Sequence, residues 1–195
     1  YVNIFKMAGL NLQILDVDIF GITNLIEQLY NPKDISILAV DIGAYITNIA
    51  IMKGENLEFT REILMGGKHL TSQIEKATKL SYREAEEKKV ANDSEISYLF
   101  EDFIYNIAAE INKTINFYLA TKPKENIAKI YLTGGSSLVK GLKEKIENDT
   151  KVSVEHLDPF LLLKGDDDKR RMHEGYKELV TTALYLSSRV VDLGS

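Results

Sequence analysis

The fold is decided by the stretch Ser36–Gly54, which reads SILAVDIGAYITNIAIMKG. Ile37–Asp41 is a nearly continuous apolar run of strand length, and Ile46–Met52 is rich in β-branched residues, so both segments favour strands. Leu57–Met65 then alternates between apolar and polar residues in the manner of a third strand. Because short segments containing glycine separate the three, the sequence predicts three successive antiparallel strands.

Helical and strand patterns surround this meander. Residues 94–121 form the longest one, with an apolar stripe that keeps a period near 3.6 and needs a sheet to cover. The order of strands and helices fits a mixed α/β sheet with right-handed crossovers, which is the order of a ribonuclease-H-like lobe. The other expected elements are a helix capped by Asp18, helices at Lys68–Leu80, after Ser81, at Leu138–Glu147 and at about Glu174–Val191, and strands at Ala128–Leu132 and Val152–Leu157.

Composition excludes several classes of function. The 195 residues are 45% hydrophobic and 27% charged, which is typical of a globular protein. The absence of cysteine excludes disulfides, cysteine-ligated zinc and thiol catalysis, and the net charge of -5 argues against nucleic acid as a partner. No apolar run approaches the roughly 20 residues that span a bilayer, so we expect no direct membrane insertion. With no signal peptide after Tyr1, we expect a cytoplasmic fragment of a longer protein.

Two glycine-containing segments are candidates for binding phosphate or nucleotide. A carboxylate at a strand end beside glycine, as in Asp41–Ala44, lets backbone N–H groups approach phosphate while the aspartate holds Mg²⁺. The segment Thr133–Ser137 follows a strand and opens a helix, where free N–H groups favour an anion. Neither segment matches the dinucleotide fingerprint or the phosphate loop. The structural alternatives are a β-turn for the first segment and a tight strand-to-helix connection for the second.

In combination these segments are more specific. Asp41-Ile-Gly-Ala, Phe59-x-Arg-x-Ile leading to Gly66-Gly67, Ala85-Glu86 with Lys89, and Leu132-Thr-Gly-Gly-Ser occur in one order. Together they resemble the second half of an actin-like ATPase, of the group with actin, heat-shock chaperones and sugar kinases. Within that group the chain resembles the PilM family of type IV pilus assembly proteins, over about Ala8 to Arg189.

The resemblance assigns roles to individual residues. It implies that Asp41 and Gly43 form the second phosphate motif, with Thr47 and the pair Gly66-Gly67 close by. Asp41 would position Mg²⁺ or the attacking water of ATP, which makes it the catalytic and metal residue. The adenosine loop would be Gly134, Gly135 and Ser136, while Glu86 and Lys89 would lie near the ribose and adenine. The alternative for Glu86 and Lys89 is a surface ion pair.

The resemblance also implies a function. It suggests an actin-like scaffold that binds ATP and Mg²⁺ between two lobes, assembles with itself, and lies on the inner membrane through the cytoplasmic tail of a PilN-like membrane protein. ATP turnover would be weak in the full-length protein and absent from this fragment. The expected division is residues 1–34 for the end of lobe one, 35–158 for the second lobe, and 159–195 for a charged loop and returning helix.

The family's first phosphate motif is not found in the chain, so we expect half of a nucleotide site. An FtsA-like cell-division protein and a small-molecule kinase of the same fold remain alternatives. The sequence shows no basic amphipathic tail for the first of these and no substrate-recognition insertion for the second.

Overall fold

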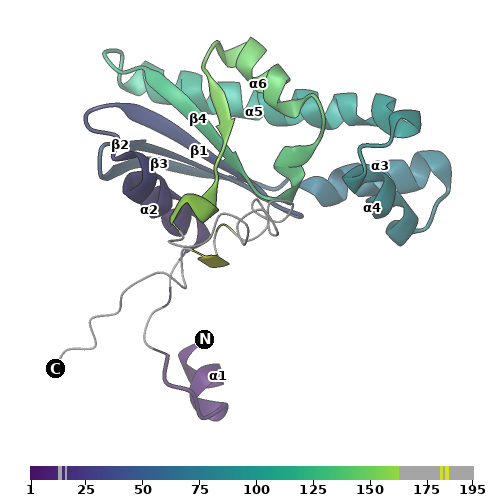
Figure 1. The fold of residues 1–195 in the computed structure, drawn as a ribbon, viewed down its shortest axis with the longest axis horizontal. Coiled ribbons are helices and arrows are strands. Elements are labelled where there is room, and N and C mark those ends of the chain that lie inside the picture. The colour runs from purple at the N-terminus through teal and green to yellow at the C-terminus, as the bar shows by residue number, and fades with distance from the viewer. Residues whose placement is uncertain (13–14, 16, 163–180, 182, 185–195) are drawn as a thin grey trace.

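The computed structural model describes the chain except for residues 13–14, 16, 163–180, 182 and 185–195. Its centre is a five-stranded mixed sheet in the order β3-β2-β1-β4-β5, with helices on both faces (Figure 1). The first three strands form the predicted antiparallel meander, and β4 and β5 continue the sheet in parallel on the other side of β1. The strands are β1 (Ser36–Ile42), β2 (Thr47–Lys53), β3 (Asn56–Ile63), β4 (Ile127–Thr133) and β5 (Val154–His156).

β1 is the central strand, and both of its faces are covered. Leu38, Val40 and Ile42 belong to the larger apolar cluster, whereas Ile37 and Ala39 belong to a second cluster on the opposite face. Successive residues of a strand point to opposite faces, so a strand buried on both sides needs a continuous apolar run. The ribonuclease-H-like α/β class expected from the order of strands and helices is confirmed.

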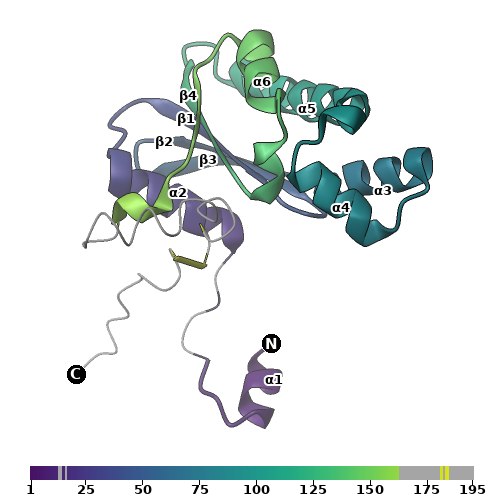
Figure 2. The same ribbon diagram turned by 45° about the vertical axis from the view of Figure 1, so that its right-hand side comes forward.

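The two faces of the sheet carry different helices. On one face lie α5 (Phe100–Thr121) and α6 (Leu142–Thr150), while α2 (Asp18–Tyr30) covers the other (Figure 2). Fully buried side chains of α2, including Leu25 and Ile26, form one cluster with residues of β1, β2 and β4. The helices α3 (Gly67–Thr78) and α4 (Tyr82–Val90) lie together at one end of the sheet, where β1 ends (Figures 1 and 2).

Three sequence predictions about helices need correction. The pattern over residues 94–121 is two elements, a 3-10 helix η1 (Ser94–Leu99) followed by α5. The single helix expected at Leu138–Glu147 is instead the end of the 3-10 helix η2 (Gly135–Leu138) followed by α6. The two are separate because Gly141 has a φ of +89°, which a helix does not allow. Asp18 does not cap α2: Val17 occupies the cap position and Asp18 lies in the first turn.

The capping box predicted after Ser81 is present at α4. The Ser81 backbone N–H donates to the Glu84 carboxylate at 2.8 Å, and the Ser81 hydroxyl oxygen accepts from the Glu84 N–H. Two orphan donors at the start of the helix are thereby satisfied. This fixes where α4, the helix that carries Glu86, begins.

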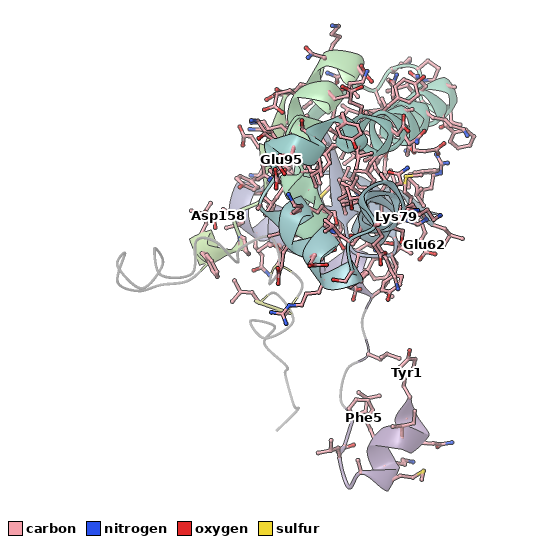
Figure 3. All side chains as sticks on the ribbon, turned by 90° about the vertical axis from the view of Figure 1, so that its right-hand side faces the viewer. Tyr1, Phe5, Glu62, Lys79, Glu95 and Asp158 are labelled. Carbon is pink, nitrogen blue, oxygen red and sulfur yellow. The ribbon has the colours of Figure 1, made fainter. Side chains whose placement is uncertain are left out.

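The ends of the described structure add two short helices, α1 (Val2–Met7) and the 3-10 helix η3 (Pro159–Leu162). Figure 3 shows α1, with Tyr1 and Phe5, set apart from the sheet, and none of its residues is buried. Most of the helix predicted at Glu174–Val191 lies outside the described residues. Across the described parts of the chain, every helix is too short or too polar to span a membrane.

Leu25→Ala should lower the free energy of unfolding by about 2–5 kcal/mol, because it leaves a cavity between α2 and the sheet. Gln28→Ala, an exposed position on the same helix, is the matched control and should change it by less than about 0.5 kcal/mol. Urea denaturation of both variants measures the difference. Equal stabilities for the two variants would show that α2 is not packed on the sheet.

Candidate functional site

The turn between β1 and β2 carries the predicted phosphate motif. Asp41 is the register partner of Asn48 across the two strands, and the Gly43 N–H donates to the Ile46 carbonyl at 3.0 Å to close the turn. Thr47 does not point outward: its side chain is fully buried, and its hydroxyl donates to the Met65 carbonyl at 2.8 Å. Thr47 therefore joins the start of β2 to the segment that follows β3.

Gly66 and Gly67 set the start of α3 directly against this turn. A Cβ atom at Gly66 would lie 2.6 Å from the Gly43 carbonyl oxygen and 2.7 Å from the Ala44 carbonyl group. The Gly67 N–H donates to the Gly43 carbonyl at 2.9 Å, and the Lys68 N–H donates to the Ala44 carbonyl at 2.8 Å. Because these two N–H groups at the start of α3 donate to protein carbonyls, they hold the turn in place and do not serve as an anion-binding site.

The loop after β4 approaches the same turn from the other side. Gly134 has a φ of +84°, and a Cβ there would lie 2.5 Å from both the Asp41 Oδ1 and the Ile42 carbonyl oxygen. Glycine is required here for its backbone conformation and for its lack of a side chain. The Ser136 hydroxyl donates to the Gly43 carbonyl at 3.0 Å. Gly135 is the exposed residue of the loop, between two buried neighbours.

Lys89 is buried, so its interpretation as half of a surface ion pair is wrong. It is 8% exposed, and its ammonium lies 2.8 Å from the Glu86 carboxylate, 3.0 Å from the Thr71 Oγ1 and 3.3 Å from the Gly67 carbonyl oxygen. An ammonium has three N–H donors, and these three partners account for all of them. Lys89 thus ties α4 to the first turn of α3 and holds the partly exposed Glu86 carboxylate in place.

Gly67 is also the point where these two groups of contacts meet. A Cβ atom on Gly67 would lie 2.1 Å from the Ser136 Oγ and 3.0 Å from the Lys89 ammonium. Eight of the ten predicted site residues are therefore connected by direct contacts through the turn, the start of α3, α4 and the β4 loop. Of the other two, Thr47 is buried and Gly135 is exposed. The ligand roles of all ten residues stay predictions.

The Asp41 carboxyl group is in an unusual electrostatic environment. Burial raises its pKa from 3.8 to about 6, and the negative charge of Asp18 adds to the rise, while a hydrogen bond with Asn48 opposes it. Sequence reasoning missed Asp18 as a neighbour of Asp41. In the sequence, Asp18 follows the apolar residue Val17 at the start of a helix, and this pattern predicts only a helix cap.

The donor set around Asp41 fits a divalent cation that brings its own ligands. Among the described residues, no group of three or more histidine or carboxylate side chains forms a closed metal cage. Mg²⁺ is usually held by one or two carboxylates together with phosphate oxygens and water. Asp41 is buried, and the charge of Asp18 raises its pKa further, so a cation beside Asp41 would offset both effects. Asp41 is therefore the residue that would hold the ion.

Similar solved structures identify the class of fold. Solved structures with the same fold include the ethanolamine utilization protein EutJ from Carboxydothermus hydrogenoformans (20% identity, 95% of this chain and 58% of that chain, TM-score 0.69). MreB5 of Spiroplasma citri bound to ADP matches with 15% identity over 95% of this chain and 62% of that chain, with a TM-score of 0.71. The fold is that of the actin-like ATPases.

The family follows from the sequence match. The model of the family "Type IV pilus assembly protein PilM" matches residues 1–188, and the chain belongs to this family. A solved PilM–PilN type IV pilus biogenesis complex contains a similar chain, with 24% identity and a TM-score of 0.82, over 93% of this chain. The chain spans about half of that relative, 54% of its length.

Asp41→Asn should make stability less dependent on pH. Because the folded-state pKa of Asp41 is raised above the ordinary value, the folded protein holds the proton more tightly, and stability falls as pH rises from about 4 to about 6. Asparagine has no proton to lose, so the variant should gain roughly 2–3 kcal/mol relative to the parent protein between pH 4 and pH 7. Urea denaturation across this range, with exposed Asp102→Asn as the control, measures the effect. Parallel pH profiles for Asp41→Asn and the parent protein would contradict the burial of this charge.

Lys89→Met should lower the free energy of unfolding by about 1–3 kcal/mol, since it removes the ammonium that donates to the Glu86 carboxylate, the Thr71 hydroxyl and the Gly67 carbonyl. Lys88→Met is the control, because Lys88 pairs with Asp93 and Glu95 nearer the surface and should cost at most about 1 kcal/mol. Thermal and urea unfolding compare the two. A Lys88 variant that loses as much stability as the Lys89 variant would show that Lys89 is not an anchor.

Proposed function

We propose that this chain forms one wall of a Mg²⁺-ATP site in a PilM-like scaffold of type IV pilus assembly. The observation that carries the proposal is the convergence of the start of α3 and the β4 loop on the turn after Asp41, with α4 held against α3 by Lys89. A Cβ atom at Gly66 or Gly134 would lie 2.6 Å or 2.5 Å from a backbone carbonyl oxygen of the turn, and one at Gly67 would lie 2.1 Å from the Ser136 Oγ. Such close backbone packing fixes the spatial relation between the predicted phosphate turn and the predicted adenosine loop.

Each wall segment would contribute a different interaction. Asp41 would hold Mg²⁺, whose charge offsets that of the phosphates and favours the ionised form of the carboxyl group. Glu86, held by Lys89 and Thr71, keeps a carboxylate partly exposed, where it would accept hydrogen bonds from ribose hydroxyls. Gly135 would leave space on the exposed edge of the loop for the nucleoside. Lys89 would act through Glu86, because its own donors are used within the protein.

Turnover of ATP by these residues would be slow. Asp41 could position the cation or a water molecule, but phosphoryl transfer also needs donors that hold the phosphates from the opposite side. The glycine turn and the β4 loop would form one side, and the start of α3 would hold the turn in place. The proposed role is therefore a nucleotide-dependent change in assembly, with hydrolysis as a slow reset.

The proposed partners follow from the family. One similar chain was solved in a complex named PilM–PilN, and we propose that this protein docks on the cytoplasmic tail of a PilN-like inner-membrane protein and assembles with copies of itself. It would then work in the cytoplasm, peripheral to the inner membrane. Residues 1–34, 35–158 and 159–195 are the proposed lobe-one end, second lobe and returning segment. The family match favours this role over an FtsA-like protein or a small-molecule kinase.

Asp41→Asn should remove the Mg²⁺ dependence of ATP binding. In the parent protein, calorimetry should show ATP binding at least tenfold tighter with Mg²⁺ than with a chelator, because the cation bridges Asp41 and the phosphates. The variant should bind ATP equally in both conditions, and Asp102→Asn should behave like the parent protein. A variant that keeps the full Mg²⁺ effect would remove Asp41 from the site, and a full-length protein that binds no ATP would refute the proposed function.

A further inference from the structure

A cavity of about 420 Å³ lies beside the candidate nucleotide site, on the outer side of the β1–β2 turn. Tyr45 of the turn forms one wall, and the exposed face of α3 forms the other. The volume lies within the range of about 300–1,000 Å³ that is usual for ligand pockets. Its lining consists of Tyr45, Lys68, His69, Ser72, Gln73 and Lys76.

The charge of this cavity differs from that of the chain. It is lined by two lysines and a histidine and by no carboxylate, although the chain has a net charge of -5. Four other cavities in the described part of the chain are each lined by at least one glutamate. Cationic side chains that converge without an acidic neighbour in the lining favour an anionic occupant.

The walls of the cavity are fixed relative to each other. The Lys68 backbone N–H donates to the Ala44 carbonyl at 2.8 Å, which joins α3 to the turn next to Tyr45. The Lys68 ammonium donates to the Tyr45 hydroxyl at 3.0 Å and lies 4.6 Å from the centre of its ring. Tyr45 is 65% exposed and yet held by these contacts, so little side-chain entropy would be lost when a partner packs on it.

The shape and composition favour a protein segment over a small anion. An exposed tyrosine ring and the aliphatic stems of Lys68 and Lys76 offer apolar area between the charged groups. Tyrosine is among the residues that most often carry binding energy at protein interfaces. The Nδ1 atom of His69 accepts from the Gly66 N–H at 3.2 Å, so the Nε2 atom carries the ring proton and is a donor.

We propose that this cavity is a docking site for an acidic segment of a partner protein. Glutamate or aspartate side chains of the segment pair with Lys68 and Lys76, and an apolar side chain between them packs on Tyr45. The site is separate from the candidate nucleotide wall but shares the β1–β2 turn with it, because Tyr45 lies four positions after Asp41. This docking does not depend on the proposed nucleotide site.

The test uses fluorescein-labelled hexaglutamate as the probe and fluorescence anisotropy as the readout. The parent chain should bind the probe at low salt, with affinity falling as salt rises, and should not bind labelled hexalysine. The double variant Lys68→Glu/Lys76→Glu should weaken binding at least tenfold. Lys124→Glu/Lys140→Glu makes the same change in net charge at exposed lysines outside the cavity and should weaken binding less than threefold.

A second pair of measurements keeps the test decisive. Lys68→Gln/Lys76→Gln removes the positive charge without adding a negative one and should also weaken binding at least tenfold, with an unchanged melting temperature. Tyr45→Ala should weaken binding of a labelled peptide in which one central glutamate is phenylalanine more than it weakens binding of hexaglutamate. Equal losses for the cavity and control variants would overturn the proposal. So would displacement of the probe by inorganic phosphate beyond the effect of chloride at equal ionic strength, because the cavity would then be a small-anion site.

Discussion

Backbone packing without side chains holds the candidate site together. Gly66 lies against the carbonyl groups of Gly43 and Ala44, Gly67 against Ser136 and Lys89, and Gly134 against Asp41. A Cβ atom at Gly66 or Gly134 would overlap backbone atoms, so the sequence must keep glycine at these two positions, and a Cβ atom at Gly67 would displace the Ser136 and Lys89 side chains. The rest of the site depends on this constraint, since these approaches and the hydrogen bonds beside them bring the turn, the start of α3 and the β4 loop to one place, while apolar packing of Leu70, Ile74 and Ala85 joins α3 to α4.

The two buried charged groups at this junction, Lys89 and Asp41, differ in whether their surroundings stabilise the charge. Lys89 is buried with partners for every donor, which ties two helices together. Asp41 is buried near another carboxylate, Asp18, so its charge is disfavoured and its pKa rises to about 6. A buried cation with all its partners avoids the cost of an unpaired charge, whereas a buried carboxylate without a cation carries that cost. Binding sites often carry such a cost, because the missing charge is supplied by the ligand.

Much of the fold could be predicted from the sequence because β1 is apolar on both faces and the meander follows it through short turns. The break before α6 could not, because a glycine at a positive φ has the same letter as any other glycine. The burial of Lys89 was also hidden, since a glutamate and a lysine three positions apart on a helix usually form an exposed pair. The approach of Asp18 to Asp41 depends on how α2 packs across the sheet, which local patterns do not encode.

The central claim is that the turn after β1, the start of α3, α4 and the β4 loop form one ligand wall. Hydrogen–deuterium exchange, measured with and without millimolar Mg²⁺-ADP, tests it most directly. The account predicts slower exchange together in residues 41–45, 66–71, 86–89 and 134–137, with no change in the outer part of α5. Slower exchange confined to one of these segments, or located elsewhere in the chain, would contradict it.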